Sequence, residues 1–120
     1  MSYTLEFLED AKRDLAGLDR EAQLAALSVA SELRENPWLG VPMRERIRVG
    51  GLSECRRVTF DEPAWAGKPR YRLVYRNLPD EATLEIVQVV AVGLRERLAV
   101  YKTAAARVRA ELRRRLASPD

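Results

Sequence analysis

Alternation of apolar and polar side chains marks three segments of the chain. In each segment, apolar residues occupy every second position, as Tyr3, Leu5 and Phe7 do near the start. This period of two is typical of a strand with one buried face. The pattern covers residues 2–8, 54–60 and 70–78. A fourth segment, residues 82–92, is mostly apolar and precedes Gly93, which predicts a central strand buried on both faces.

A spacing of three or four residues between apolar positions predicts helices elsewhere. Residues 9–18 show this spacing, and so do residues 96–117 near the end of the chain. Another helix is predicted after Asp19, whose side chain suits the N-cap, and it ends at Asn36 because proline follows. The first two helices then form a hairpin. Loops rich in glycine and proline are predicted in residues 37–53 and 61–69.

The order of these elements is β-α-α-β-β-β-α, which predicts an α+β fold. The simplest assembly is an antiparallel β-sheet with the N-terminal helical hairpin packed on it and a helix at the C-terminus. A length of 120 residues suits one domain, so we expect residues 1–120 to form a single unit. Within that unit, residues 102–117 are expected to extend as a basic C-terminal helix.

The amino-acid content excludes several kinds of site. The chain has no histidine and a single cysteine, Cys55, so neither a structural zinc site nor a disulfide framework is expected. Cys55 lacks a histidine to activate it and is predicted to be a small buried residue. The sequence shows no apolar run of about 18 residues and no secretory leader pattern. We therefore expect a cytoplasmic protein that makes no use of a membrane.

Charge is distributed unevenly along the chain. Residues 1–40 hold 4 Lys/Arg and 8 Asp/Glu, whereas residues 41–120 hold 17 Lys/Arg and 10 Asp/Glu. Of the basic residues, 18 are arginine and 3 are lysine. Arginine binds phosphate through two parallel hydrogen bonds and stays protonated. The second part of the chain is therefore expected to meet an anionic partner, with RNA or DNA first in line.

Three short motifs in the basic part resemble one known family. Residues 71–75 read Tyr-Arg-Leu-Val-Tyr, residues 90–97 read Val-Ala-Val-Gly-Leu-Arg-Glu-Arg, and Val100-Tyr101 follows. Together they resemble the RelE branch of the RelE/ParE toxins, which belong to type II toxin–antitoxin systems. The opening strand and the helical hairpin also fit, so the resemblance covers roughly residues 2–108.

The resemblance implies a metal-independent endoribonuclease that cleaves messenger RNA on the ribosome. In that reaction the RNA 2′-hydroxyl attacks the adjacent phosphate and the 5′-oxygen leaves. No metal or other cofactor is implied. The implied partners are a cognate antitoxin protein, messenger RNA and ribosomal RNA, and a hetero-oligomer of toxin and antitoxin is the expected assembly.

The same resemblance assigns roles to individual residues. Arg72 matches a family arginine that steadies the phosphate, and Arg95 matches one that stabilises charge on the leaving group. Tyr101 matches a tyrosine that stacks on or orients the substrate. Arg57 and Thr59 stand where the family has two lysines. Arg57 cannot replace a lysine as general base because arginine stays protonated. Thr59 cannot do so without a group that activates it.

Other residues complete the predicted site. Lys68, in the loop before the third strand, is a replacement for the missing base, and Glu54, Asp61, Glu62 and Tyr101 are alternatives. Further RNA contacts are predicted for Thr59, Arg48, Arg70 and Arg97. Trp65 is expected to anchor its loop, with stacking on a nucleobase as the alternative.

Two other functions remain open at this point. A ParE-type toxin that inhibits DNA gyrase has the same fold, so the fold does not separate it from a ribonuclease. The long terminal helix and the replacement of both family lysines are compatible with gyrase inhibition. Alternatively, loss of the base leaves a catalytically weak protein that acts only by binding an antitoxin or RNA. The apolar side of the terminal helix either packs on the sheet or receives the antitoxin.

Overall fold

The computed structural model describes residues 2–43, 54–96 and 99–117. Its strands are β1 (Thr4–Phe7), β2 (Val41–Pro42), β3 (Cys55–Phe60), β4 (Tyr71–Leu78) and β5 (Ile86–Leu94). Its helices are α1 (Glu9–Ala16), α2 (Arg20–Glu35) and α3 (Ala99–Ala117). The predicted α+β class and order of helices are confirmed. Asp19 stands at the N-cap position of α2, but its side chain makes no capping hydrogen bond.

The strands form one sheet in the order β1-β5-β4-β3-β2. Strands β3, β4 and β5 pair antiparallel, as predicted, and the short β2 pairs antiparallel with β3. Strand β1 instead runs parallel to β5, with Leu5 opposite Val87. The sheet is therefore mixed rather than wholly antiparallel. Parallel pairing requires a long connection, and the whole chain from α1 to β4 lies between these two strands.

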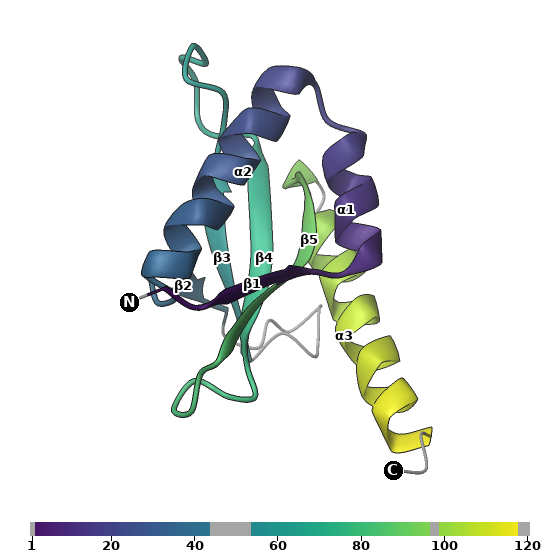
Figure 1. Ribbon diagram of the computed structural model, residues 1–120. Helices are drawn as coiled ribbons and strands as arrows, with labels where there is room; N and C mark the ends of the chain where they lie inside the picture. Colours follow the sequence, from purple (N-terminus) through teal and green to yellow (C-terminus); the bar gives the residue numbers. More distant parts are fainter. Residues whose placement is uncertain (1, 44–53, 97–98, 118–120) are drawn as a thin grey trace.

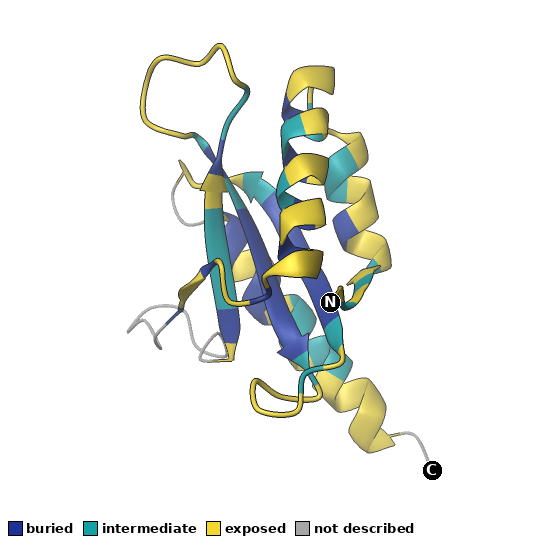
Figure 2. Cartoon of the chain, turned by 60° about the vertical axis from the view of Figure 1, so that its left-hand side comes forward, coloured by how far each residue is buried: buried dark blue, intermediate teal, exposed yellow. Residues whose placement is uncertain are grey.

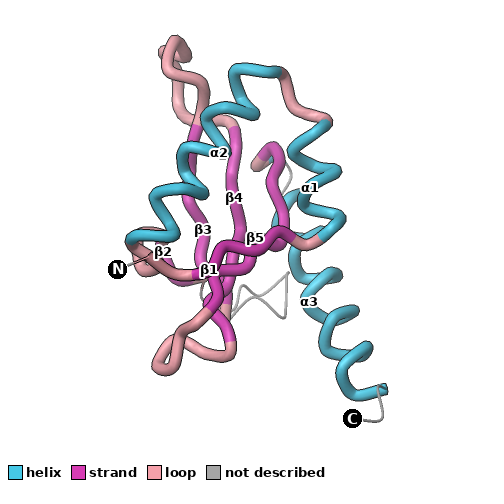
Figure 3. The backbone as a smooth tube through the Cα atoms, viewed as in Figure 1, coloured by secondary structure: helices cyan, strands magenta, loops and turns pink. Residues whose placement is uncertain are grey.

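Helices α1 and α2 cover one face of this sheet, here called the hairpin face (Figures 1 and 3). Alternation along β4 turns Tyr71, Leu73 and Tyr75 toward these helices, where they join one apolar core. Helix α2 contributes buried residues at helical spacing to the same core, including Ala22, Ala26 and Leu33. The predicted apolar stripe of this helix is therefore the surface that holds the hairpin to the sheet.

Helix α3 packs against the opposite face, here called the terminal-helix face (Figure 1). A second core lies between them and contains Cys55, Val74, Val90, Tyr101 and Ala104. The last turns of α3 extend past the sheet and are exposed, as the yellow end of the helix in Figure 2 shows. Leu112 and Leu116 lie on this exposed part, so they do not pack on the sheet.

Two segments differ from their predicted structure for local reasons. Val41 and Pro42 form the short strand β2 inside a predicted loop, and Gly40 lets the chain approach Tyr75, because a Cβ there would lie 2.7 Å from the ring. Strand β5 starts at Ile86 rather than residue 82. Asp80 accepts hydrogen bonds from the backbone N–H groups of Ala82 and Thr83 and so holds the preceding residues in a turn.

Two further findings concern the described part of the chain. None of its helices is both long and apolar enough to cross a membrane. Within the same residues, no three histidine, cysteine, aspartate or glutamate side chains gather in a group that could hold a metal ion.

Candidate functional site

Arginines of the central strands emerge on the terminal-helix face. Arg57 and Thr59 alternate with Val58 and Phe60, which belong to the core on the hairpin face, so the first two point away from α1 and α2. Thr59 pairs with Arg72 across β3 and β4. Register and alternation therefore bring Arg57, Thr59 and Arg72 together on one face. The side chain of Arg57 has no hydrogen bond or ion pair with any described residue.

The guanidinium of Arg72 is folded back onto its own strand. Its Nη1 donates to the carbonyl oxygens of Pro69 and Tyr71, each at 2.9 Å. Its Nε is buried and lacks a hydrogen-bond partner in the described part of the chain. A buried donor without a partner costs roughly 1–3 kcal/mol, so an outward turn toward a bound anion supplies a missing acceptor.

A hollow of about 460 Å³ lies where β4 begins and β5 ends. Lys68 and Arg95 both line it, and the backbone N–H of Arg95 donates to the carbonyl of Arg70 at 3.0 Å. Neither cation has a salt bridge to any described carboxylate. The structure thus brings the predicted replacement base, Lys68, beside the predicted charge-stabilising Arg95, although they are 27 positions apart in the sequence.

The side chain of Arg70 binds residues of the loop between β3 and β4. It forms two hydrogen bonds with the carboxylate of Asp61, at 2.8 and 2.9 Å, and its guanidinium carbon lies 3.5 Å from the centroid of the Trp65 ring. The hydrogen bonds from Arg70 hold the pKa of Asp61 well below its usual range. Direct binding of RNA phosphate by Arg70 therefore has to compete with this pair.

This cluster was not foreseen from the sequence as a unit. Asp61 and Arg70 stand at the two ends of the loop between β3 and β4. Their opposite charges at these positions were the sequence signal that could have predicted the ion pair. With its carboxylate bound to Arg70, Asp61 is a poor general base. Glu62 lies 4.0 Å from the same guanidinium. Lys68 is consequently the predicted base with the least engaged side chain in this loop.

Tyr101 lies on the terminal-helix face but is buried there. Its side chain is 1% exposed and packs in the second core with Cys55, Val74 and Val90. The predicted stacking of Tyr101 on a substrate would require this ring to leave the core. In the structure, the ring packs within the protein. Cys55 is buried as predicted, and burial raises the pKa of its thiol to about 11, which keeps it protonated at neutral pH.

Two predicted RNA contacts, Arg48 and Arg97, lie outside the described residues. The remaining predictions divide into two groups. Arg57, Thr59, Arg72, Lys68 and Arg95 lie on the terminal-helix face or at the adjoining end of the sheet. Arg70 and Tyr101 are engaged within the protein.

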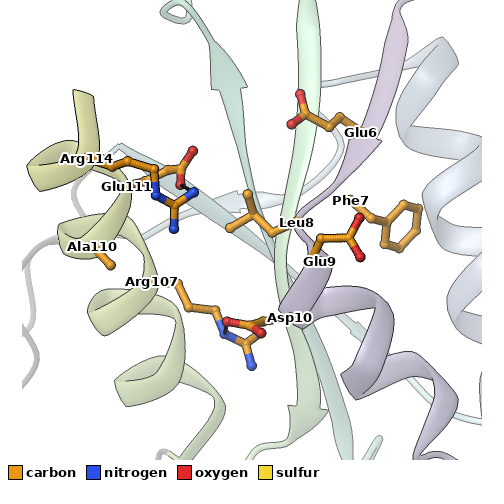
Figure 4. Close-up of a pocket in the computed structure, with 9 residues that line it drawn as sticks. All are labelled: Glu6, Phe7, Leu8, Glu9, Asp10, Arg107, Ala110, Glu111 and Arg114. Carbon is orange, nitrogen blue, oxygen red and sulfur yellow. Dashed lines mark ion pairs between the residues drawn. The ribbon is translucent and has the colours of Figure 1, made fainter. Parts of the chain in front are cut away.

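Another hollow, of about 450 Å³, separates α3 from the junction of β1 and α1 (Figure 4). Its charged groups mostly pair with one another or with nearby residues. Arg107 donates to Asp14 at 2.6 and 3.0 Å and to the carbonyl of Val90, and Arg114 pairs with Glu111. These contacts tie α3 to α1 and β5, so this hollow has a structural explanation.

Comparisons with known proteins identify the family of the chain. The sequence model of the family described as "ParE toxin of type II toxin-antitoxin system, parDE" matches residues 5–99. A curated Escherichia coli protein described as RelE-like toxin is 28% identical over 109 residues, covering 91% of this chain and 100% of that protein.

Solved structures of toxins share the fold. A free double-arginine mutant of Escherichia coli toxin RelE superposes with a TM-score of 0.62 at 25% identity, covering 89% of this chain and 98% of that one. A chain of the RelBE2 toxin–antitoxin complex from Mycobacterium tuberculosis gives a TM-score of 0.57 at 27% identity, covering 79% and 100%. The chain therefore belongs to the RelE/ParE family of toxins of type II toxin–antitoxin systems.

Proposed function

We propose that this toxin is a ribosome-dependent endoribonuclease that cleaves messenger RNA without a metal. One observation carries the proposal: Arg57, Lys68 and Arg95 present charge at one end and face of the sheet without a described internal partner. Most other described arginines are bound to the protein itself, as Arg56 and Arg70 are. The exposed Glu96 lines the same hollow as Lys68 and Arg95 but forms no described salt bridge with either. Cations without a carboxylate partner suit a polyanion.

The proposed chemistry uses these groups in order. Arg72 turns outward and grips the scissile phosphate together with Arg57. The 2′-hydroxyl of the preceding ribose loses its proton and its oxygen attacks the phosphorus, while the bond to the 5′-oxygen breaks. Arg95 stabilises the negative charge that develops as the 5′-oxygen leaves and takes up a proton. A cyclic phosphate and a 5′-hydroxyl result.

Lys68 is the proposed base. Its exposed side chain lines the hollow together with Arg95 and has no described salt bridge. A general base contributes typically about 10²–10⁴-fold to the rate.

The test is induction of the toxin in cells that lack its antitoxin, with new messenger RNA 5′ ends mapped by primer extension. We expect cuts inside translated codons for the wild-type protein. An Arg72→Ala/Arg95→Ala double variant should lose at least about 100-fold of this cleavage, because each arginine contacts the reacting phosphate. A double variant that cuts like the wild type would contradict the proposal.

DNA gyrase inhibition is the second candidate, supported by two observations. The matching family model is that of ParE, and Tyr101 is buried rather than open to a substrate. Growth arrest with intact messenger RNA and with gyrase activity lost in a supercoiling assay would favour this function. If the induced protein neither arrests growth nor cleaves messenger RNA, the result would indicate a protein that acts only by binding.

An antitoxin partner is proposed with either activity. The solved relatives include toxins in complex with RelB-type antitoxins. On this chain, Leu112 and Leu116 form an exposed apolar strip on the projecting end of α3, flanked by arginines. An acidic segment with apolar residues at matching spacing is the expected complement.

A further inference from the structure

We propose that Trp65 is a stacking platform for an unpaired base of the RNA substrate, positioned by Arg70 and Asp61. The inference rests on the proposed ribonuclease function and adds a substrate-positioning residue to that site. The sequence predicted that Trp65 anchors its loop, with stacking on a nucleobase as the alternative. In the structure the ring contacts residues of its own loop and Arg70 at the end of that loop.

The ring is held by contacts within its own loop. The backbone N–H of Trp65 donates to the carbonyl of Glu62, and its Nε1 donates to the carbonyl of Lys68, both at 3.0 Å. The guanidinium of Arg70 lies over the ring, and Asp61 fixes that guanidinium with two hydrogen bonds and also accepts from the backbone N–H of Arg70. The orientation of the indole is thus set before any ligand arrives.

The ring is nevertheless largely outside the protein interior. Trp65 is 41% exposed and belongs to neither of the two apolar cores. A tryptophan that only closed the loop would be more stable when buried against the nearby sheet, because removal of a large apolar side chain from water is favourable. In Figure 2 the loop stands clear of the helices as a mostly exposed arch. Arg70 covers one face of the oriented indole, and the part of the ring that stays exposed is the surface on which a base would stack.

The platform adjoins the basic groups of the proposed site. Arg70 supports the ring and also lines the hollow that contains Lys68 and Arg95. Arg72 donates to the carbonyl of Pro69 in the same loop. A nucleotide whose phosphate reaches Arg95 therefore has its own or a neighbouring base within the region of Trp65. Stacking is indifferent to base identity, which suits an enzyme that meets many codons.

The test uses the full chain and a single-stranded RNA 12-mer without self-complementarity as the probe. In a Trp38→Phe background, Trp65 is the sole tryptophan, so its emission reports on this ring alone. We expect saturable quenching of the emission when RNA is added. Binding of labelled RNA, followed by anisotropy, should weaken by about 10-fold in Trp65→Leu and by less than about 3-fold in Trp65→Phe, which keeps an aromatic face.

Trp38→Leu is the matched control, since Trp38 is similarly exposed but packs edge-on to Tyr3 near β1. Its RNA affinity should equal that of the wild type. Equal affinities of Trp65→Leu and Trp65→Phe, or an emission that RNA does not change, would overturn the platform. Because the emission experiment leaves Trp65 intact, it decides the matter even if Trp65→Leu fails to fold.

Primer extension on the same variants separates the two proposals. If the wild type and Trp65→Leu cut messenger RNA equally and Trp65 emission is unchanged by RNA, the ribonuclease stands and the platform falls. If RNA quenches Trp65 while the wild type cuts no message, the platform stands as an RNA-binding feature and the ribonuclease falls.

Discussion

Arg56 and Arg57 are neighbours in β3, and their side chains leave the strand on opposite faces of the sheet. On the hairpin face, Arg56 donates to Glu81 and to the carbonyl oxygens of Trp38 and Gly40. On the other face, Arg57 meets no described partner. Two identical side chains on consecutive residues thus stabilise the fold in one case and stay available for a ligand in the other.

The same contrast recurs at the end of the sheet. Arg70 and Arg95 are joined by a backbone hydrogen bond, yet Arg70 is bound to Asp61 and stacked on Trp65 while Arg95 lines an open hollow. Net charge along the sequence does not distinguish these roles. The partner of each guanidinium does, because an arginine paired with a carboxylate offers little net charge to a phosphate.

The largest expected effect is a loss of stability from a substitution in the core of the hairpin face. Leu33 of α2 is 0% exposed in the core of the hairpin face. Leu33→Ala should lower the free energy of unfolding by about 2–5 kcal/mol, because the cavity fills only in part. Urea denaturation followed by circular dichroism measures this. Leu27→Ala, on the same helix but 45% exposed, is the control and should change it by less than about 0.5 kcal/mol. Equal losses in both variants would contradict the assignment of the core.

A smaller effect is expected at Tyr75 on the same face. Its hydroxyl donates to the carbonyl of Pro37 and accepts from the N–H of Gly40, at 2.7 and 2.9 Å, and burial raises its pKa to about 12. Tyr75→Phe leaves the N–H of Gly40 unpaired, which should cost about 1–3 kcal/mol of unfolding free energy.

The pH dependence of that variant sharpens the prediction. A tyrosine in an unfolded chain titrates near pH 10, so the folded-state stabilisation is complete below that pH and is lost as the pH rises toward 12. Tyr75→Phe should therefore show a shallower loss of stability over this interval in denaturation curves measured at several pH values. A wild-type slope retained in the variant would assign the alkaline loss to another group.

Most of the fold was predictable because its signals are local. Alternation in residues 54–60 and 70–78 located β3 and β4, and helical spacing located both hairpin helices. The parallel direction of β1 depends on its distant neighbour β5, which no local pattern reports. Strand β2 has two residues, one of them proline, and is too short to produce a periodic signal.

The site was predictable in part for the same reason. Alternation placed Arg57 and Thr59 on one face of their strand, whereas the pairing of Thr59 with Arg72 comes from the register of β3 with β4. Whether an arginine is engaged depends on carboxylates and carbonyls elsewhere, so the pairing of Arg70 with Asp61 was not visible from its motif. Tyr101 matched a family position, but its burial depends on how α3 packs on the second core.

The neighbouring arginines of β3 allow the most direct test of the distinction between the two faces. Arg56→Ala and Arg57→Ala should each be compared with the wild type in thermal unfolding and in ribosome-dependent cleavage of messenger RNA. We expect Arg56→Ala to lose about 1–2 kcal/mol of stability while cutting normally below its melting temperature. Arg57→Ala should keep its stability and lose at least about 10-fold of its cleavage. Loss of cleavage in Arg56→Ala alone, or normal cleavage in Arg57→Ala, would contradict the account.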